Sequence, residues 1–130
     1  MNNTIDLDIT RLDDLGKMSI EGKFQMMNLL KFKKQIDDTD MTGIQKYAEY
    51  MKAAMPFFII SGGRIIYDGQ AHFSLIGPER EWDKVIIVEY PSMSHFINMI
   101  TNKGYPEHLR ASALENSRLI LCEKSTDTND

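Results

Sequence analysis

The sequence is poor in the residues that crosslink small domains or bind metals. Its 130 residues contain three histidines and one cysteine, Cys122, which cannot form an internal disulfide. The histidines show neither a His-x-x-x-His nor a Glu-x-x-His spacing, and there is no cysteine pair. No metal site is therefore expected, and no cofactor is predicted. A chain of this length can bury a hydrophobic core without such crosslinks.

Long hydrophobic runs and an excess of basic residues are also absent. The longest apolar stretch, Ala53–Ile60, is interrupted by Pro56 and is far shorter than the ~20 residues that span a membrane. The 15 basic and 19 acidic side chains give a net charge of −4, which disfavours binding to nucleic acid or to an anionic membrane surface. The first residues lack the basic and apolar regions of a secretory signal. With the single cysteine, this predicts a cytoplasmic protein.

The length predicts one domain, with a helical extension before it and a polar tail after it. In residues 1–24, Leu7, Ile9, Leu12 and Leu15 recur near helical spacing, and Gly16 is placed to end that helix. Residues 25–123 carry the main domain. Residues 124–130 form a polar tail that lacks an apolar anchor.

Strand and helix signals alternate through the main domain. Gln25–Phe32, Lys84–Tyr90 and Arg118–Glu123 are apolar runs that predict strands. The other expected elements are a helix from Ile44 to Met55, strand segments at Phe57–Ile60, Arg64–Tyr67 and Ala71–Ile76, a helix from Met93 to Ile100 with Ser92 as its N-cap, and a short helix that begins at Pro106. This β-α-β-β-α-β order is typical of the ferredoxin-like fold, an α+β architecture with an antiparallel sheet and both main helices on one face.

Three local patterns set the expected boundaries. Thr42 and Gln45 fit a capping box at the start of a helix. Pro56 is expected to end that helix, because proline supplies no backbone N–H. Asp68-Gly69 is a hairpin-type signal, so it predicts a turn between the two strand segments on either side of it.

The predicted strands are apolar on both faces. Successive side chains of a strand point to opposite sides, and in Lys84–Tyr90 both Val85 with Ile87 and Ile86 with Val88 are hydrophobic. Two helices can cover only one face, and the other would expose an apolar patch that monomers rarely show. Pairing of two sheets in a homodimer is therefore predicted. The alternative is that residues 1–24 cover this face.

Residues between positions 25 and 122 also occur in a recognisable order. They are Met27–Phe32, Gly43 with Tyr47 and Tyr50, Gly62-Gly63-Arg64, Ile76-Gly77, Trp82-Asp83, Glu89-Tyr90-Pro91-Ser92, Phe96, Met99, Tyr105, Arg110 and Ser117–Ile120. In this order the sequence resembles the DUF1330 family of dimeric α+β-barrel proteins. The resemblance implies a homodimer whose two sheets close into a barrel. It implies no activity, although the wider superfamily includes cofactor-independent monooxygenases and haem-degrading enzymes.

Polar residues on otherwise apolar strands are the main functional signal. Asn28 lies between Met26 and Leu30 on one strand face, and Glu89 follows Ile87 on another. Buried polar groups need partners, which arginines and tyrosines can supply. The candidate ligand-binding residues are Asn28, Tyr47, Arg64, Trp82, Glu89, Tyr105 and Arg110, with Tyr50 as a further hydroxyl. No catalytic residue is identified.

Two interpretations of this set stay open. In one, a pocket between sheet and helices binds a small anionic or carbonyl compound, in a binding protein or in an enzyme such as a monooxygenase-like protein. In the other, an ion-pair network fixes the helix packing or the dimer of a non-catalytic structural protein. The position of Glu89 favours pairing with Arg64 or Arg110, which would lower its pKa. Burial without a cation would raise it.

Overall fold

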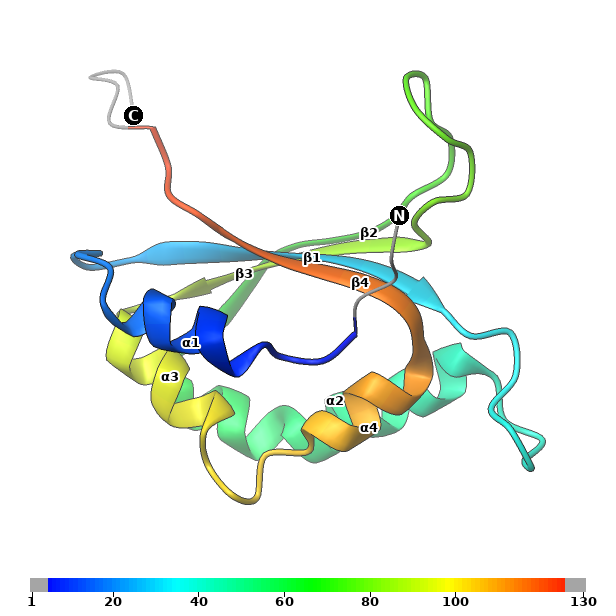
Figure 1. Cartoon of the computed structure of the whole chain (residues 1–130), viewed down its shortest axis with the longest axis horizontal. Coiled ribbons are helices and arrows are strands. Elements are labelled where there is room, and N and C mark those ends of the chain that lie inside the picture. The colour runs from blue at the N-terminus through cyan, green and yellow to red at the C-terminus, as the bar shows by residue number, and fades with distance from the viewer. Residues whose placement is uncertain (1–4, 126–130) are drawn as a thin grey trace.

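The computed structural model describes residues 5–125 and contains a four-stranded antiparallel sheet with helices on one side (Figure 1). The elements in chain order are α1 (Ile9–Gly16), β1 (Phe24–Phe32), α2 (Gly43–Ser61), β2 (Arg64–Gln70), β3 (Lys84–Tyr90), α3 (Met93–Ile100), α4 (Glu107–Ala113) and β4 (Leu114–Cys122). The strand order is β2-β3-β1-β4. This is the ferredoxin-like α+β arrangement, so the predicted fold class is confirmed.

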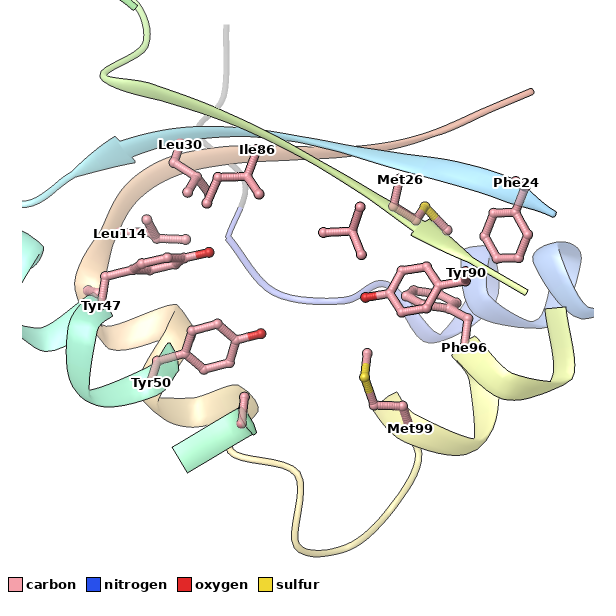
Figure 2. Close-up of a cluster of buried hydrophobic side chains, with 13 residues drawn as sticks. Phe24, Met26, Leu30, Tyr47, Tyr50, Ile86, Tyr90, Phe96, Met99 and Leu114 are labelled. Carbon is pink, nitrogen blue, oxygen red and sulfur yellow. The ribbon is translucent and has the colours of Figure 1, made fainter. Parts of the chain in front are cut away.

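The register of β1 fixes which side chains face the helices. Met26 lies opposite Val88 of β3, and both point to the helix side of the sheet, where they belong to the core. Phe24, Leu30 and Leu114 are fully buried in the same layer. Figure 2 shows Phe24, Met26 and Leu30 above the aromatic residues that α2 and α3 contribute. Burial of this apolar surface is the main favourable contribution to folding.

Helix α2 is longer than the sequence predicts, and Pro56 lies inside it. The strand predicted at Phe57–Ile60 is therefore wrong. The ring of Phe58 packs against Tyr90 with the two centroids 6.5 Å apart, and this contact offsets the backbone hydrogen bond that the proline cannot donate. The helix ends at Gly62, whose φ of 73° lies in the left-handed region that glycine adopts without strain.

The strand predicted at Ala71–Ile76 is also wrong, because these residues form a loop. Asp68-Gly69 does not make a turn but lies within β2, which pairs with β3 as far as Gln70. Glycine is suited to position 69 because a side chain there would collide with the ring of Tyr67. The loop rises from the sheet on the side away from the helices (Figure 1). Its exposed apolar side chains are Phe73, Leu75 and Ile76.

Helix α1 forms where the sequence predicts it and ends at Gly16. The Asp8 carboxylate caps its start by accepting a hydrogen bond from the backbone N–H of Thr10 at 2.9 Å. Ile5 and Leu15 pack against the core on the helix side of the sheet. Residues 5–24 therefore leave the other face open, and the alternative that they cover it is wrong. Most of the predicted tail, 124–130, lies outside the described residues.

The short helix α4 follows Pro106 as predicted, and β4 begins directly after it, four residues earlier than expected. A backbone contact joins α4 to α2, since the Gly43 N–H donates to the Lys33 carbonyl and the Lys33 N–H donates to the Ala113 carbonyl. A side chain at position 43 would collide with both carbonyl oxygens. Glycine thus sets the distance between the two helices that carry most polar groups of the site described below. No helix within residues 5–125 is long and apolar enough to cross a membrane.

Candidate functional site

A cavity of about 90 Å³ lies between the inner face of the sheet and helices α2, α3 and α4. Its walls are mainly apolar, with Met26, Ile86 and Val88 on the sheet side. Its polar lining residues are Asn28, Tyr47, Tyr50, Tyr90, Tyr105, Glu107 and Arg110. An apolar cavity with a few convergent polar groups is the usual form of a small-molecule site.

Four tyrosines bring hydroxyl groups to this cavity. Tyr47 and Tyr50 lie one turn apart on α2, Tyr90 ends β3, and Tyr105 lies in the loop before α4. The hydroxyls of Tyr47, Tyr50 and Tyr90 are directed toward the space between the three rings (Figure 2). The hydroxyls of Tyr50 and Tyr105 hydrogen-bond to each other. Residues far apart in the chain thus converge on one small volume.

These tyrosines are hydrogen-bond donors at neutral pH. Burial raises the pKa of each of them, and raises that of Tyr105 to about 12. The positive charge of Arg110 opposes this rise but is outweighed by desolvation. Because the hydroxyls stay protonated, those of Tyr47 and Tyr90 can each donate to an acceptor atom in the cavity. One hydroxyl of the Tyr50–Tyr105 pair donates to the other, which leaves one donor from that pair.

Arg110 is the one arginine that residues 5–125 contribute to the cavity lining, and only 6% of the residue is exposed. Its Nη2 atom donates to Asn28 Oδ1 at 3.2 Å, and Asn28 Nδ2 donates to the backbone carbonyl of Ile86 at 3.3 Å. The asparagine thus ties the guanidinium to the sheet. Within residues 5–125, no carboxylate forms an ion pair with Arg110. A buried charge without a paired counter-ion is unfavourable. Binding of an anion to the Arg110 guanidinium would therefore be favourable.

Glu107 lies one turn before Arg110 on α4 and also lines the cavity. Its Oε2 atom is buried and has no hydrogen-bond partner among the described residues. Burial raises the pKa of this carboxyl group, and the attraction to Arg110 only partly opposes the shift. A carboxyl group with a raised pKa and no fixed partner can take up a proton or accept a hydrogen bond from a bound molecule.

An open groove of about 600 Å³ adjoins the cavity. It runs between the N-terminal segment, helix α3 and the inner face of β4. Leu7, Phe96, Arg110 and Leu119 line both the cavity and the groove. The buried guanidinium therefore lies where the two spaces meet.

Glu89 lies on the opposite, open face of the sheet. Its carboxylate accepts hydrogen bonds from Arg64 Nη2 at 2.8 Å and from Gln25 Nε2 at 3.0 Å, and Lys124 Nζ lies 3.9 Å away. The bonds from Arg64 and then Gln25 hold the pKa of Glu89 below its usual value. The predicted pairing with Arg64 is confirmed. The Glu89 side chain is only 7% exposed, although no helix of residues 5–125 lies on this face (Figure 1).

The structure divides the predicted site residues between the two faces. Asn28, Tyr47, Tyr105 and Arg110 come together in the cavity, with Tyr50 beside them. Arg64, Trp82 and Glu89 do not line it; the Arg118 guanidinium lies 5.2 Å from the centre of the Trp82 ring.

Sequence reasoning missed two polar lining residues, Tyr90 and Glu107. Tyr90 alternates with Val88 and Ile86 on one side of β3, and Glu107 precedes Arg110 by one helical turn. Both spacings are visible in the sequence. Among residues 5–125, no group of three or more His, Cys, Asp or Glu side chains is arranged to hold a metal ion.

Comparisons with known proteins agree with this architecture. The family model of "Domain of unknown function (DUF1330)" matches residues 35–124. A crystal structure of RPA0582, a protein of unknown function from Rhodopseudomonas palustris, is 33% identical with a TM-score of 0.86, and covers 97% of this chain and 100% of its own. The methylated form of RPA0582 is 32% identical with a TM-score of 0.87, and covers 98% and 99%. No curated protein matches the sequence.

A more distant likeness concerns the fold alone. A dimeric ferredoxin-like protein of unknown function from Thermobifida fusca is 8% identical with a TM-score of 0.50, over 83% of this chain and 96% of that one. Nothing among the compared proteins supports the monooxygenase-like alternative.

Proposed function

The chain belongs to the DUF1330 family, which is defined by sequence and not by an activity, and from its cavity we propose that it binds a small organic anion between the sheet and the helices. The observation that carries this proposal is that Arg110 is buried and forms no ion pair with a carboxylate among residues 5–125. A guanidinium that is 6% exposed and has no carboxylate partner within residues 5–125 lines a cavity whose other walls are mainly apolar.

The polar groups around Arg110 are complementary to a carboxylate. The guanidinium offers several N–H donors in a planar arrangement that matches the two oxygens of a carboxylate. The protonated hydroxyls of Tyr47 on α2 and Tyr90 on β3 add neutral donors to the same cavity. Asn28 holds one edge of the guanidinium toward the sheet and so limits its orientations. A carbonyl oxygen could use the same donors, but only an anion would also compensate the buried positive charge.

Isothermal titration calorimetry with sodium hexanoate tests the proposal. Arg110→Gln should weaken binding about 10- to 100-fold, because a hydrogen-bonded charge pair is worth ~1.5–3 kcal/mol. Arg64→Gln is the matched control, since it removes an arginine on the opposite face, and it should leave the affinity unchanged. Equal affinity of the wild type and Arg110→Gln for hexanoate would contradict the proposal.

A second proposal concerns the open face of the sheet, which we infer to pair with the same face of a second copy. Its outward side chains include Met27, Leu29 and Ile87, and no element of residues 5–125 covers them. The loop with exposed Leu75 and Ile76 rises on this side (Figure 1), where it could contact a partner. A homodimer would remove this apolar surface from water. The Thermobifida fusca protein of similar fold is described as dimeric, which supports this pairing.

A further inference from the structure

The groove beside the cavity has an apolar lining that the binding of a small anion alone does not explain. Three parts of the chain supply its apolar walls. These are Leu7, Leu12 and Leu15 of the N-terminal segment, Ile100 of α3, and Leu119 and Leu121 on the inner face of β4. An acid as small as acetate would leave this surface in contact with water.

Polarity changes in a fixed order along the two connected spaces. The tyrosine hydroxyls line the inner cavity, Arg110 lies at the junction, and apolar side chains make up most of the outer groove. The groove lining also includes the polar and charged residues Asp6, Asp8, Arg11, Ser117 and Arg118. A ligand that matches this order carries one anionic group at its inner end and an apolar tail at its outer end. A second negative charge in the cavity would be unfavourable, because the described residues of its lining contain one arginine and the carboxyl group of Glu107. In the groove, Asp6 and Asp8 would likewise disfavour a second negative charge beside them.

We propose that the cavity and the groove form one site for an amphipathic monocarboxylate. The carboxylate pairs with Arg110, and the apolar tail lies in the groove between the N-terminal segment and β4. This inference rests on the proposed function and adds the chemical class of the ligand. It also gives the N-terminal segment a role, since the segment forms one wall of the tail compartment although it precedes the region matched by the family model.

The affinity for a homologous series of acids tests the role of the groove. Calorimetry on the full chain should use the sodium salts of butanoate, hexanoate and octanoate, with octanol as the uncharged probe. Each added methylene should tighten binding about fourfold while the tail stays within the groove, as expected for burial of apolar surface. Octanol should bind at least tenfold more weakly than octanoate, because it cannot compensate the charge of Arg110.

Two leucine variants locate the tail. Leu12 lines the groove but not the cavity, so Leu12→Gln should weaken octanoate binding about tenfold and leave butanoate binding unchanged. Leu75→Gln makes the same chemical change on the exposed loop and should alter neither affinity. Thermal unfolding of both variants verifies that each is folded before it is titrated.

The possible failures are distinguishable. An affinity that does not change with chain length but falls in Arg110→Gln would overturn the tail compartment and leave anion binding intact. An affinity that rises with chain length equally for the wild type, Arg110→Gln and octanol would show apolar adsorption and would contradict both proposals. Absence of binding by every acid in the series would also contradict both.

Discussion

The arginines on the two faces of the sheet differ in solvent exposure and in whether they pair with a carboxylate. On the open face, the side chain of Arg64 is 67% exposed and still has a carboxylate partner, Glu89, at 2.8 Å. On the helix-covered face, Arg110 is 6% exposed and has no such partner within residues 5–125. Water could solvate the first charge without help, whereas the second needs a counter-ion. The unbalanced charge therefore lies where a ligand can supply the missing anion.

The largest expected effect comes from placing a charge on the open face. Met27→Asp should convert a dimer into a monomer, because each copy would bury a carboxylate whose cross-strand neighbours, Ile87 and Ile120, supply no cation, at a cost of several kcal/mol. Ile59→Asp is the control, since Ile59 is exposed on α2, and it should leave the dimer intact. Light scattering at micromolar concentration measures the mass. A wild-type chain that is already monomeric would contradict the proposed pairing.

Replacing Arg110 should raise the free energy of unfolding, whereas replacing Arg64 should lower it. Arg110→Met, without added anion, should raise the free energy of unfolding by about 1–2 kcal/mol, because a buried unpaired charge is replaced by an apolar side chain. Arg64→Met should lower it, because Glu89 then loses its nearest cation. Urea unfolding of both variants provides the comparison. A decrease for Arg110→Met would show that its bond to Asn28 is chiefly structural.

Loss of the Glu89 carboxylate should have a smaller effect. The folded-state pKa of Glu89 is lowered, so its contribution to stability is present above the ordinary pKa of 4.5 and is lost as the pH falls through the lowered value. Glu89→Gln should therefore reduce stability at pH 7 by less than ~1 kcal/mol, since Arg64 is largely exposed to solvent. The difference from the wild type should shrink in acid. A difference that is independent of pH would contradict the ion pair.

Glu107 should show the opposite sign and the smallest effect. Its folded-state pKa is raised, so the folded state holds the proton more tightly, and stability declines as the pH rises from 4.5 through the raised value. Glu107→Gln should remove this decline and be slightly more stable than the wild type at neutral pH. Bound anion should raise the pKa of Glu107 further, so hexanoate binding should include proton uptake in the wild type and not in Glu107→Gln. Calorimetry in buffers of different ionisation enthalpy measures that uptake.

Local patterns predicted most of the fold. The apolar runs in β1 and β3 and the cap at Ser92 depend on neighbouring residues, and the structure confirms them. The strand prediction for Phe57–Ile60 was wrong because a short apolar run rich in β-forming residues does not distinguish a strand from a buried helix. Packing of Phe58 on Tyr90, a residue distant in sequence, decided that case.

Only about half of the candidate site residues were predicted correctly, because local patterns do not show which residues meet in space. Periodicity separates the two faces of a strand, but it does not show which apolar face the helices cover. Asn28 and Glu89 were therefore assigned to one pocket, although the register places them on opposite faces. Given the face of Val88, the same alternation assigns Tyr90 to the cavity.

The most direct test of the central claim compares the two arginines in one sample. The Nε–H resonances of Arg64 and Arg110 can be assigned in nitrogen-edited NMR spectra by means of Arg64→Gln and Arg110→Gln. On titration with sodium hexanoate, the Arg110 signal should shift until one hexanoate is bound per chain and then stay constant. The Arg64 signal should not shift. An Arg110 signal that does not move while the protein is saturated with the acid, or equal shifts of both signals, would contradict the account.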